Sequence, residues 1–476
     1  NDFIQLPLPP STSPPEPREV YEGSYRGVRP PPGVAAVVPV TAHELSDAWS
    51  QGGSYSGALE RLAQSYVSDV IAPLLPGEAS VRFRKRVVEG SGLSYLEAQG
   101  LPFRFAFLPY FIDTTRSSTD SLMSLMPGMS ELARSTLSTI RRRFSERYGV
   151  NPPLEVIQAG LLESLFQLRN SKSSSKEDVM ELLWEMIGGY FVNLGQRLPR
   201  PKGSRPKQSP EASLAAAPID ELVLESQGES PHLSEAIDFV SDTVLSLIPH
   251  RSTVEALFRR VSSLLSSGFV DLLMVDSDRG AIRVLPEPCW GDIISEADRL
   301  GVPVVLDLRR GLEGSQAHAE SLKVLAYRML ERLIAWKHEA WRRRERGSPN
   351  VVIFIDEAHQ FFPSEGKSRE EAEEVSEVAS MIAKVARLGR SRGIGLVFST
   401  HSPRDLNSIV LQLTNTKVLL RSEESQVEVL SLPQEVKQYL PRLQDRYMAV
   451  VSYALREGYV FAETTTPLTM HYDMSA

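Results

Sequence analysis

The stretch VVIFIDEAH, residues 351–359, decides the fold that we expect for the last third of this chain. Its first five residues are apolar, and a short apolar run without polar alternation predicts a buried strand of a parallel sheet. Asp356 and Glu357 follow directly. Ligands of open α/β sheets bind beyond the carboxyl ends of the strands. We therefore expect two neighbouring carboxylates at a ligand site.

Similar apolar runs lie on both sides of this stretch. They occupy residues 302–307 (VPVVLD), 394–400 (IGLVFST) and 416–420 (TKVLL). Apolar residues at helical spacing, from Leu322 to Leu333, predict a long amphipathic helix between the first two strands. A second helix is expected at about 369–388. Strands that alternate with helices predict an α/β fold with a parallel sheet covered on both faces.

The adjacent acids suit phosphoryl transfer. That reaction needs a carboxylate near the Mg²⁺ that bridges the β- and γ-phosphates of ATP, and Asp356 fits this role through a coordinated water. A second group must orient the attacking water, and Glu357 is the candidate. We interpret the stretch as a Walker B motif. The alternative is an acidic turn between a strand and a loop.

Two further features carry candidate site residues. The strand at 394–400 ends in Thr400-His401, which would place polar groups beside the acids, where they can sense the γ-phosphate. The alternative is an ordinary strand end. Arg390 follows Gly389 in a predicted loop, and an arginine there can act on the nucleotide of a neighbouring subunit. The alternative is a surface arginine.

A phosphate-binding loop is harder to find. Gly366-Lys367-Ser368 imitates the end of one, but the full pattern needs a glycine at position 361, which is Phe. The tripeptide also follows the acids instead of preceding them, so we expect only a helix N-terminus there. The Walker A loop is then absent from the sequence, and we expect truncation before Asn1 to have removed it.

The preceding part of the chain divides by composition. We expect 1–128 to be the N-terminal part of an ATPase core, with a proline-rich start, a strand at 33–41, a helix at 43–75 and strands within 81–113. Helical patterns at 129–198 predict an inserted bundle, and a linker follows at 199–232. The C-terminal part of the core is expected at 233–476, with a first helical stretch at 233–267.

Composition excludes several classes of protein. A hydrophobic fraction of 42% and a charged fraction of 24% are ordinary for a globular protein, and no apolar run is long enough to span a membrane. One cysteine, Cys289, excludes an intrachain disulfide framework and suits the cytoplasm. The net charge of −8 argues against a globally basic nucleic-acid binder, although a motor can confine basic charge to a pore. Clusters at 82–86, 141–143 and 342–344 are candidates for phosphate contacts or solvated helix ends, and no DNA-binding residue is assigned.

Three segments together resemble the HerA branch of the HerA/FtsK superfamily of DNA translocases. They are IDEAHQFFP (355–363), GRSRGIGLVFSTHSPRDL (389–406) and LTNTKVLLR (413–421), in the order and spacing of that family. The resemblance is strong over 302–421. His401 departs from it, because the family commonly has glutamine there.

The resemblance implies a RecA-like P-loop ATPase core with an inserted helical bundle. It also implies ATP and Mg²⁺ as cofactors, a ring that is usually hexameric, double-stranded DNA through the centre, and a nuclease partner of the NurA type in DNA-end processing. Two alternatives stay open: a nucleotide-dead structural subunit of such a ring, and a motor of the conjugation or packaging type.

Overall fold

The structure, a computed structural model, describes most of residues 31–464 as a mixed α/β chain with parallel strand pairs, as the sequence predicts. Within that range it leaves out residues 53, 76–79, 92, 127, 170–220, 224–232, 248–249, 277–280, 309–316, 345–347, 365–382, 384–388, 390 and 445. The described chain forms two compact units. The first draws on 1–34, 290–303 and 322–476, and the second on 35–289 and 304–321. The domain boundaries drawn from composition stay a prediction.

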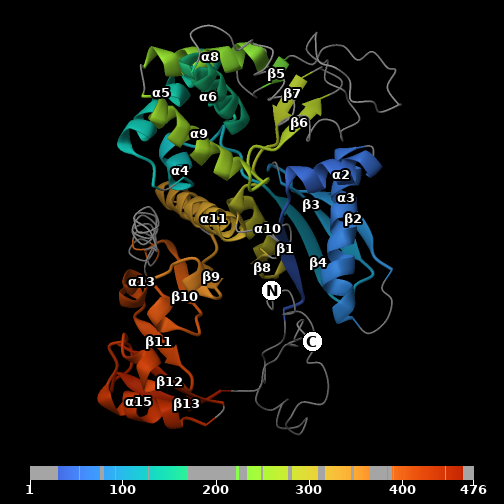
Figure 1. Ribbon diagram of the computed structural model, residues 1–476. Coiled ribbons are helices and arrows are strands. Elements are labelled where there is room, and N and C mark those ends of the chain that lie inside the picture. Colours follow the sequence, from blue (N-terminus) through green and yellow to red (C-terminus); the bar gives the residue numbers. More distant parts are fainter. Residues whose placement is uncertain are drawn as a thin grey trace. The chain divides into compact units, whose positions relative to one another are not determined.

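The second unit contains a five-stranded sheet (Figure 1). Its strands, in spatial order, are β2 (Arg82–Val87), β3 (Ser94–Gln99), β4 (Arg104–Tyr110), β1 (Gly33–Pro39) and β8 (Val304–Leu306). β1 is buried along its whole length, in keeping with its continuous apolar sequence. It pairs in parallel with β8, with Ala36 opposite Val305.

Helices α2 (Ala42–Gly52) and α3 (Tyr55–Tyr66) belong to the same unit. Ser54 begins α3 by accepting a hydrogen bond from the Gly57 N–H, and Tyr66 ends it. The Tyr66 ring packs on Phe105 and Phe107 of β4. Its hydroxyl donates to Asp307, directly after β8, at 2.6 Å. One buried side chain thus fixes α3 to two strands, because a buried hydroxyl needs a partner.

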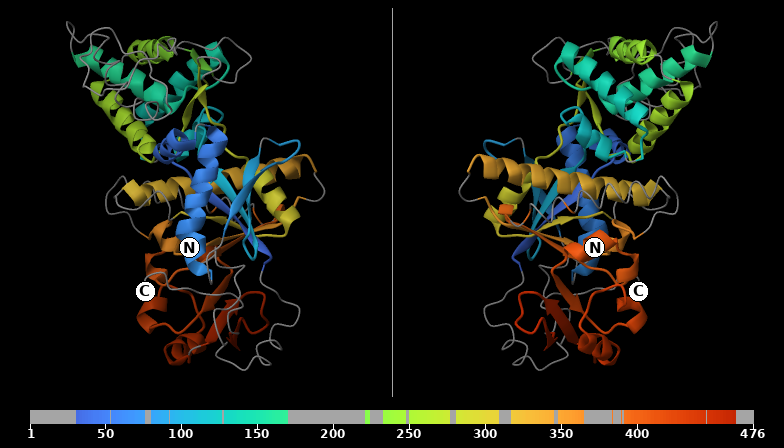
Figure 2. Two further views of the ribbon diagram at one scale, coloured as in Figure 1. Left: turned by 90° about the vertical axis from the view of Figure 1, so that its right-hand side faces the viewer. Right: turned by 90° about the vertical axis from the view of Figure 1, so that its left-hand side faces the viewer.

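A helical bundle forms the other part of the second unit (Figures 1 and 2). Its helices are α4 (Thr119–Ser124), α5 (Glu131–Tyr148), α6 (Leu154–Arg169), α8 (Leu233–Ser246) and α9 (Arg251–Leu265). The expected helices are therefore confirmed over 129–169 and 233–267, and the remainder of the stretch expected to be helical, 170–198, lies outside the described residues. Gly160 shows how closely α6 and α8 approach, since a Cβ there would lie 2.6 Å from the Val240 side chain.

This unit also contains a small sheet that the sequence does not predict. β6 (Leu273–Asp276) and β7 (Ala281–Val284) are antiparallel, and β5 (Glu221–Val223) pairs in parallel with β7. β5 lies in the stretch that we expected to be a linker, so that prediction is wrong for these residues. Strands of three and four residues carry too little periodicity to stand out in a sequence.

Asp271 joins the sheet region to the bundle. Its carboxylate accepts hydrogen bonds from the Thr114 N–H and hydroxyl, each at 2.6 Å, and from the Leu154 N–H at the start of α6, at 2.9 Å. Burial, reinforced by the nearby Asp113 carboxylate, raises the pKa of Asp271 to about 6.

The first unit contains α10 (Trp290–Leu300), the part of α11 (Ala317–Arg342) from residue 322 onward, β9 (Val351–Ile355) and β10 (Ile394–Phe398). β9 and β10 form a parallel pair, as expected. β8 pairs with β1 instead of with these strands. Ile353 and Ile355 are buried, whereas Val352 and Phe354 on the other face of β9 are 57% and 60% exposed. Among the described residues, one face of β9 is therefore largely uncovered, whereas both faces of β1 are covered.

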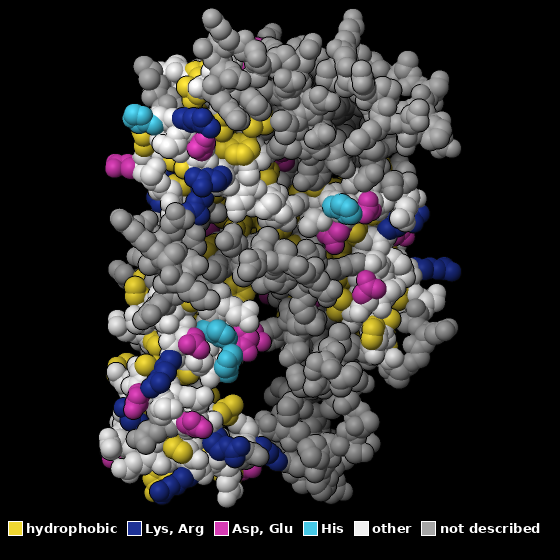
Figure 3. Space-filling model, viewed as in Figure 1, with side chains coloured by type: hydrophobic (Ala, Val, Ile, Leu, Met, Phe, Trp, Pro, Cys, Tyr) yellow, Lys and Arg dark blue, Asp and Glu magenta, His cyan; other side chains and the backbone are white. Residues whose placement is uncertain are grey.

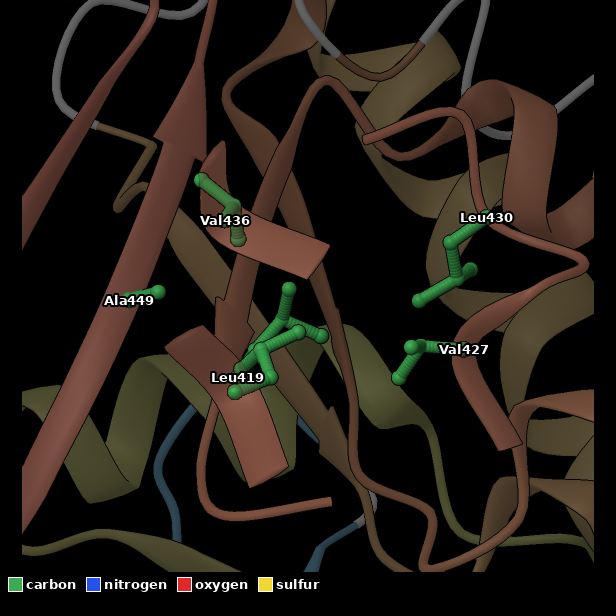
Figure 4. Close-up of a cluster of buried hydrophobic side chains, with 6 residues drawn as sticks. Leu419, Val427, Leu430, Val436 and Ala449 are labelled. Atoms are coloured by element: carbon green, nitrogen blue, oxygen red, sulfur yellow. The ribbon is translucent and has the colours of Figure 1, made fainter. Parts of the chain in front are cut away.

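The fourth expected strand belongs to a different sheet. β11 (Thr416–Leu419) pairs antiparallel with β12 (Tyr447–Ser452), which pairs with β13 (Tyr459–Glu463), so its assignment to the parallel sheet is wrong. Short helices α13 (Ser408–Leu413), α14 (Glu424–Val427) and α15 (Gln434–Tyr439) accompany this sheet. A shared apolar core, drawn in Figure 4, includes Leu419, Val427, Leu430, Val436 and Ala449. β11 pairs with β12 because both strands pack against this core. No local sequence pattern shows that contact.

The raised pKa of Asp271 predicts a pH-dependent stability. Between pH 4 and 6 the folded protein binds a proton at Asp271 that the unfolded chain releases, so stability falls as pH rises through this window. Relative to Asp271→Asn, which does not titrate, the wild type should lose on the order of 2–3 kcal/mol of unfolding free energy between pH 4 and 7. Urea denaturation of both proteins across this pH range measures it.

Asp120→Asn serves as the control, because Asp120 is exposed on α4 in the same unit. A wild-type minus Asp271→Asn difference that is constant with pH would contradict the assignment of a buried, protonating carboxyl.

Candidate functional site

The register of β9 and β10 brings two strand ends together. Val351 lies opposite Ile394, and Ile355 lies opposite Phe398. The hydrogen bonding continues past both strands: the Ser399 N–H donates to the Ile355 carbonyl at 2.9 Å, and the Ala358 N–H donates to the Ser399 carbonyl at 2.8 Å. Polar residues that follow β10 therefore lie beside those that follow β9, as the sequence predicts.

Glu357 has an unusual backbone conformation. Its φ of 47° and ψ of 47° lie in the left-handed region, which costs a residue with a Cβ about 1–2 kcal/mol. It directly precedes the short 3₁₀ helix η4 (Ala358–Gln360), in which Ala358 is fully buried. Strained non-glycine residues of this kind cluster at functional sites, where surrounding contacts hold them. The fixed Ala358 and the Ser399 carbonyl provide such contacts here.

The Glu357 carboxylate lies between two imidazoles. Its Oε2 atom is 2.9 Å from Nδ1 of His401 and 3.3 Å from Nδ1 of His359. The two rings meet edge to face, with centroids 4.7 Å apart. No role is predicted for His359 from the sequence. The sequence feature that could have indicated a role is the position of His359, two residues after Glu357 and at the same strand end.

Thr400 contacts His359 and not Glu357. Its hydroxyl lies 3.2 Å from His359 Nδ1, and it also bonds the backbone N–H and carbonyl of Ser402, each at 3.2 Å. Thr400 therefore orients His359 and the turn that carries His401. Of the two imidazoles, His401 is the accessible one, with its side chain 70% exposed, compared with 18% for His359.

Asp356 differs from its neighbour, because it is exposed and its carboxylate makes no hydrogen bond or ion pair within the described part of the chain. Magnesium prefers carboxylate and water oxygens. An exposed carboxylate at the carboxyl end of a parallel strand fits a water-mediated contact to Mg²⁺, whereas the carboxylate of Glu357 already contacts His359 and His401.

The loops after the two strands are tied to each other. The Ser364 N–H donates to the Asp405 carbonyl at 2.8 Å, and the Asn407 N–H donates to the Phe362 carbonyl at 2.9 Å. Phe362 packs edge to face on Phe398 of β10. The Tyr327 hydroxyl of α11 donates to the Phe361 carbonyl. These contacts fix the chain on both sides of the Glu357–His401 pair.

Several sequence predictions lie outside the described residues. They are Arg390, the Gly366-Lys367-Ser368 tripeptide and most of the helix expected at 369–388. Arg392, two residues after Arg390, has its guanidinium 5.7 Å from the centre of the Trp341 ring of α11.

The basic clusters differ in how available they are for phosphate contacts. Arg141 is fully buried and donates to the carbonyls of Thr114 and Ser117, so it is a structural residue. Arg342 and Arg343 both lie within ion-pair distance of Glu339 near the end of α11. Arg141 is therefore neither a phosphate contact nor a solvated helix end, whereas the exposed ion pairs of Arg342 and Arg343 favour a solvated helix end.

Histidine and acidic side chains lie next to one another on the surface (Figure 3). The close pairs that carry this pattern are Glu357 with His359 and His401 in the first unit, and His43 with Asp47 on α2 in the second. Only the first group combines two imidazoles with one carboxylate among the described residues. It also stands beside the exposed carboxylate of Asp356, which makes this strand end the candidate site.

Comparison with known proteins supports the resemblance found in the sequence. Residues 338–420 match the family model described as Helicase HerA-like C-terminal. The match includes all of IDEAHQFFP and GRSRGIGLVFSTHSPRDL and all but the last residue of LTNTKVLLR. The recognition of a HerA-like segment is thus confirmed. No curated protein matches the chain.

Solved structures with detectable similarity include the genome packaging NTPase B204 from Sulfolobus turreted icosahedral virus 2. With sulfate, it is 17% identical with a TM-score of 0.25, over 36% of this chain and 70% of that one. With ATP-gammaS, the values are 17% and 0.24, over 35% and 68%. The DNA-packaging ATPase B204 from Sulfolobus Turreted Icosahedral Virus gives 18% and 0.23, over 35% and 67%. Similarity at this level carries no inference about function.

No helix in the described part of the chain is both long and apolar enough to cross a membrane.

The β9–β10 pairing predicts that Gly393 is required for the site. Gly393 has φ of +69°, its carbonyl accepts the Val351 N–H at 2.8 Å, and a Cβ there would overlap the Asn350 side-chain oxygen. Gly393→Ala should therefore cost about 1–2 kcal/mol and loosen the start of the pair. Hydrogen exchange of peptides that cover 351–358 should become faster.

Gly395→Ala, two residues further along and within β10, is the matched control. Its added Cβ would lie 3.6 Å from Val352, an ordinary contact. Equal exchange rates in the two variants would show that Gly393 does not set the register.

Proposed function

We propose that this chain, whose residues 338–420 match the HerA-like C-terminal family, is the catalytic part of an ATPase that moves double-stranded DNA. The observation that carries the proposal is the pair of adjacent parallel strand ends. One supplies Asp356 and Glu357, and the other supplies Thr400 and His401. Phosphoryl transfer needs this combination of a metal-binding carboxylate, a water-orienting group and a phosphate-contacting residue.

Asp356 and Glu357 have different roles in the proposed hydrolysis of ATP. Bound Mg²⁺ would bridge the nucleotide phosphates and neutralise developing charge. Asp356, free of protein partners among the described residues, holds that ion through water. Glu357 orients the attacking water. Its Oε2 contacts both imidazoles, so its other oxygen is the one left to accept a hydrogen bond from water.

His401 is the candidate link between nucleotide state and protein. Its side chain is largely exposed, so a phosphate can reach it, and its Nδ1 contacts Glu357 at 2.9 Å. A change at the γ-phosphate that moves His401 therefore also moves the water-orienting carboxylate. Thr400 acts behind it by fixing His359 and the turn at Ser402. Arg390, which lies outside the described residues, is proposed to reach the nucleotide of a neighbouring subunit.

The finer features of the proposal rest on the family resemblance. They are a ring, usually of six subunits, with duplex DNA through its centre, and a NurA-type nuclease partner in DNA-end processing. Contacts to duplex DNA without sequence preference require only phosphate-binding side chains.

The water-orienting role predicts the effect of Glu357→Gln. The amide keeps the shape of the side chain but is a far poorer acceptor, so ATP turnover should fall at least about 100-fold. ATP binding should be retained. Measurement of phosphate release by the wild-type and variant proteins, with nucleotide binding measured in parallel, tests this.

Glu435→Gln on α15 is the control, since Glu435 is exposed and distant in sequence from the strand ends. If the Glu357→Gln protein hydrolyses ATP at the wild-type rate, Glu357 does not orient the water. If wild-type protein neither binds nor hydrolyses ATP, the nucleotide-dead alternative replaces the proposal.

DNA movement predicts that linear duplex DNA stimulates ATP hydrolysis, by roughly tenfold or more, and that the stimulation falls steeply with salt because it depends on phosphate contacts. Single-stranded DNA of the same length is the control. If duplex DNA does not change the rate of ATP hydrolysis, the protein is still an ATPase, but the proposal that it moves DNA is wrong.

A further inference from the structure

We propose that Glu357, His359 and His401 form a binding site for a divalent transition-metal ion of the zinc type, separate from the magnesium contact assigned to Asp356. Three potential ligand atoms, one from each residue, lie within 4.8 Å of one another. They come from two strand ends whose positions are fixed by backbone hydrogen bonds.

The distances suit a metal ion. Zinc binds nitrogen and oxygen ligands at about 2.0–2.2 Å, so two ligands of a tetrahedral zinc lie roughly 3.3 Å apart. Oε2 of Glu357 is 3.3 Å from His359 Nδ1 and 2.9 Å from His401 Nδ1. A small outward movement of the exposed His401 ring would lengthen the Glu357–His401 contact to the separation that zinc requires.

The kind of ligand selects the kind of ion. Two imidazoles and one carboxylate suit zinc, cobalt or nickel, whereas magnesium prefers oxygen ligands in an octahedron and rarely accepts imidazole. Zinc sites in proteins use this set of ligands, two histidines and one glutamate, with the remaining coordination position left for water or substrate. The same site should therefore discriminate against the magnesium that accompanies ATP.

The surroundings support binding as well. Glu357 and His401 are 44% and 70% exposed, which gives an ion a path from solvent, while His359 is held at 18% exposure. If a metal ion binds, His359 Nδ1 coordinates the ion and loses its contact with the Thr400 hydroxyl. The hydroxyl keeps its two bonds to the Ser402 backbone, so it is not left without partners.

Metal binding would occupy the carboxylate that the proposed function assigns to the attacking water. Zinc should therefore inhibit ATP hydrolysis at saturating Mg²⁺, and removal of zinc should restore it. This consequence rests on the proposed function, whereas binding of the ion itself does not.

Cobalt provides a direct test, because its visible absorption becomes intense when it leaves octahedral water for a four- or five-coordinate protein site. Untagged, metal-free protein is titrated with Co²⁺ in excess Mg²⁺. We expect such a spectrum with one Co²⁺ bound per chain, its loss on addition of Zn²⁺, and affinity weakened on the order of 100-fold in His401→Gln, given that even outer partners of metal ligands change affinity 10–100-fold.

His43→Gln is the matched control. His43 Nδ1 lies 3.2 Å from Asp47 Oδ2, but this exposed pair has a single imidazole, so the substitution should leave Co²⁺ binding unchanged. His401 is exposed, and its substitution should leave the fold intact, which circular dichroism checks.

The outcomes separate the two proposals. A spectrum of hydrated Co²⁺ only, or one that His401→Gln does not alter, overturns the metal site and leaves the role of Glu357 in ATP hydrolysis as it stands. A Co²⁺ site lost in His401→Gln supports the metal site even if Glu357→Gln does not affect ATP hydrolysis. In that case the proposed catalytic role fails alone.

Discussion

The candidate site depends on the backbone hydrogen bonds that continue the β9–β10 pairing beyond the strands. The Ser399 N–H bonds the Ile355 carbonyl, and the Ala358 N–H bonds the Ser399 carbonyl. In-register parallel pairing places both carboxyl ends at one edge, so residues more than 40 positions apart in sequence meet there. If the register shifted by one residue, each side chain would move to the other face and the Glu357–His401 contact would be lost.

This constraint also explains the strain at Glu357. The bond from Ala358 to Ser399 and the burial of Ala358 fix the chain immediately after the carboxylate, and the left-handed conformation of Glu357 is how the backbone reaches that position. Contacts with the neighbouring residues hold the backbone of Glu357 in this conformation, although it is about 1–2 kcal/mol less favourable than a right-handed one. The consequence is a carboxylate held in a defined place, within reach of two imidazoles.

The neighbouring acids therefore have different environments although they are adjacent. Asp356 is exposed and available to oxygen-coordinated ions, whereas Glu357 is held by nitrogen donors. This difference is the reason that the proposed magnesium contact, the proposed water-orienting group and the proposed zinc-type site can share one strand end. It also distinguishes the two sets of experiments, since substitution of His401 tests the nitrogen-rich site without touching Asp356.

The sequence by itself determined the local elements and the chemistry at their ends. The apolar runs at 33–39, 351–355 and 394–398, the helices of the bundle, and the position of Asp356 and Glu357 directly after an apolar strand all follow from short-range patterns. Only the tertiary structure decided which strands pair, since β8 joins β1 and β11 joins β12 through contacts that no local pattern encodes. It also decided that His359 belongs to the site and that Arg141 is buried, because a side chain's environment is set by residues far away in the chain.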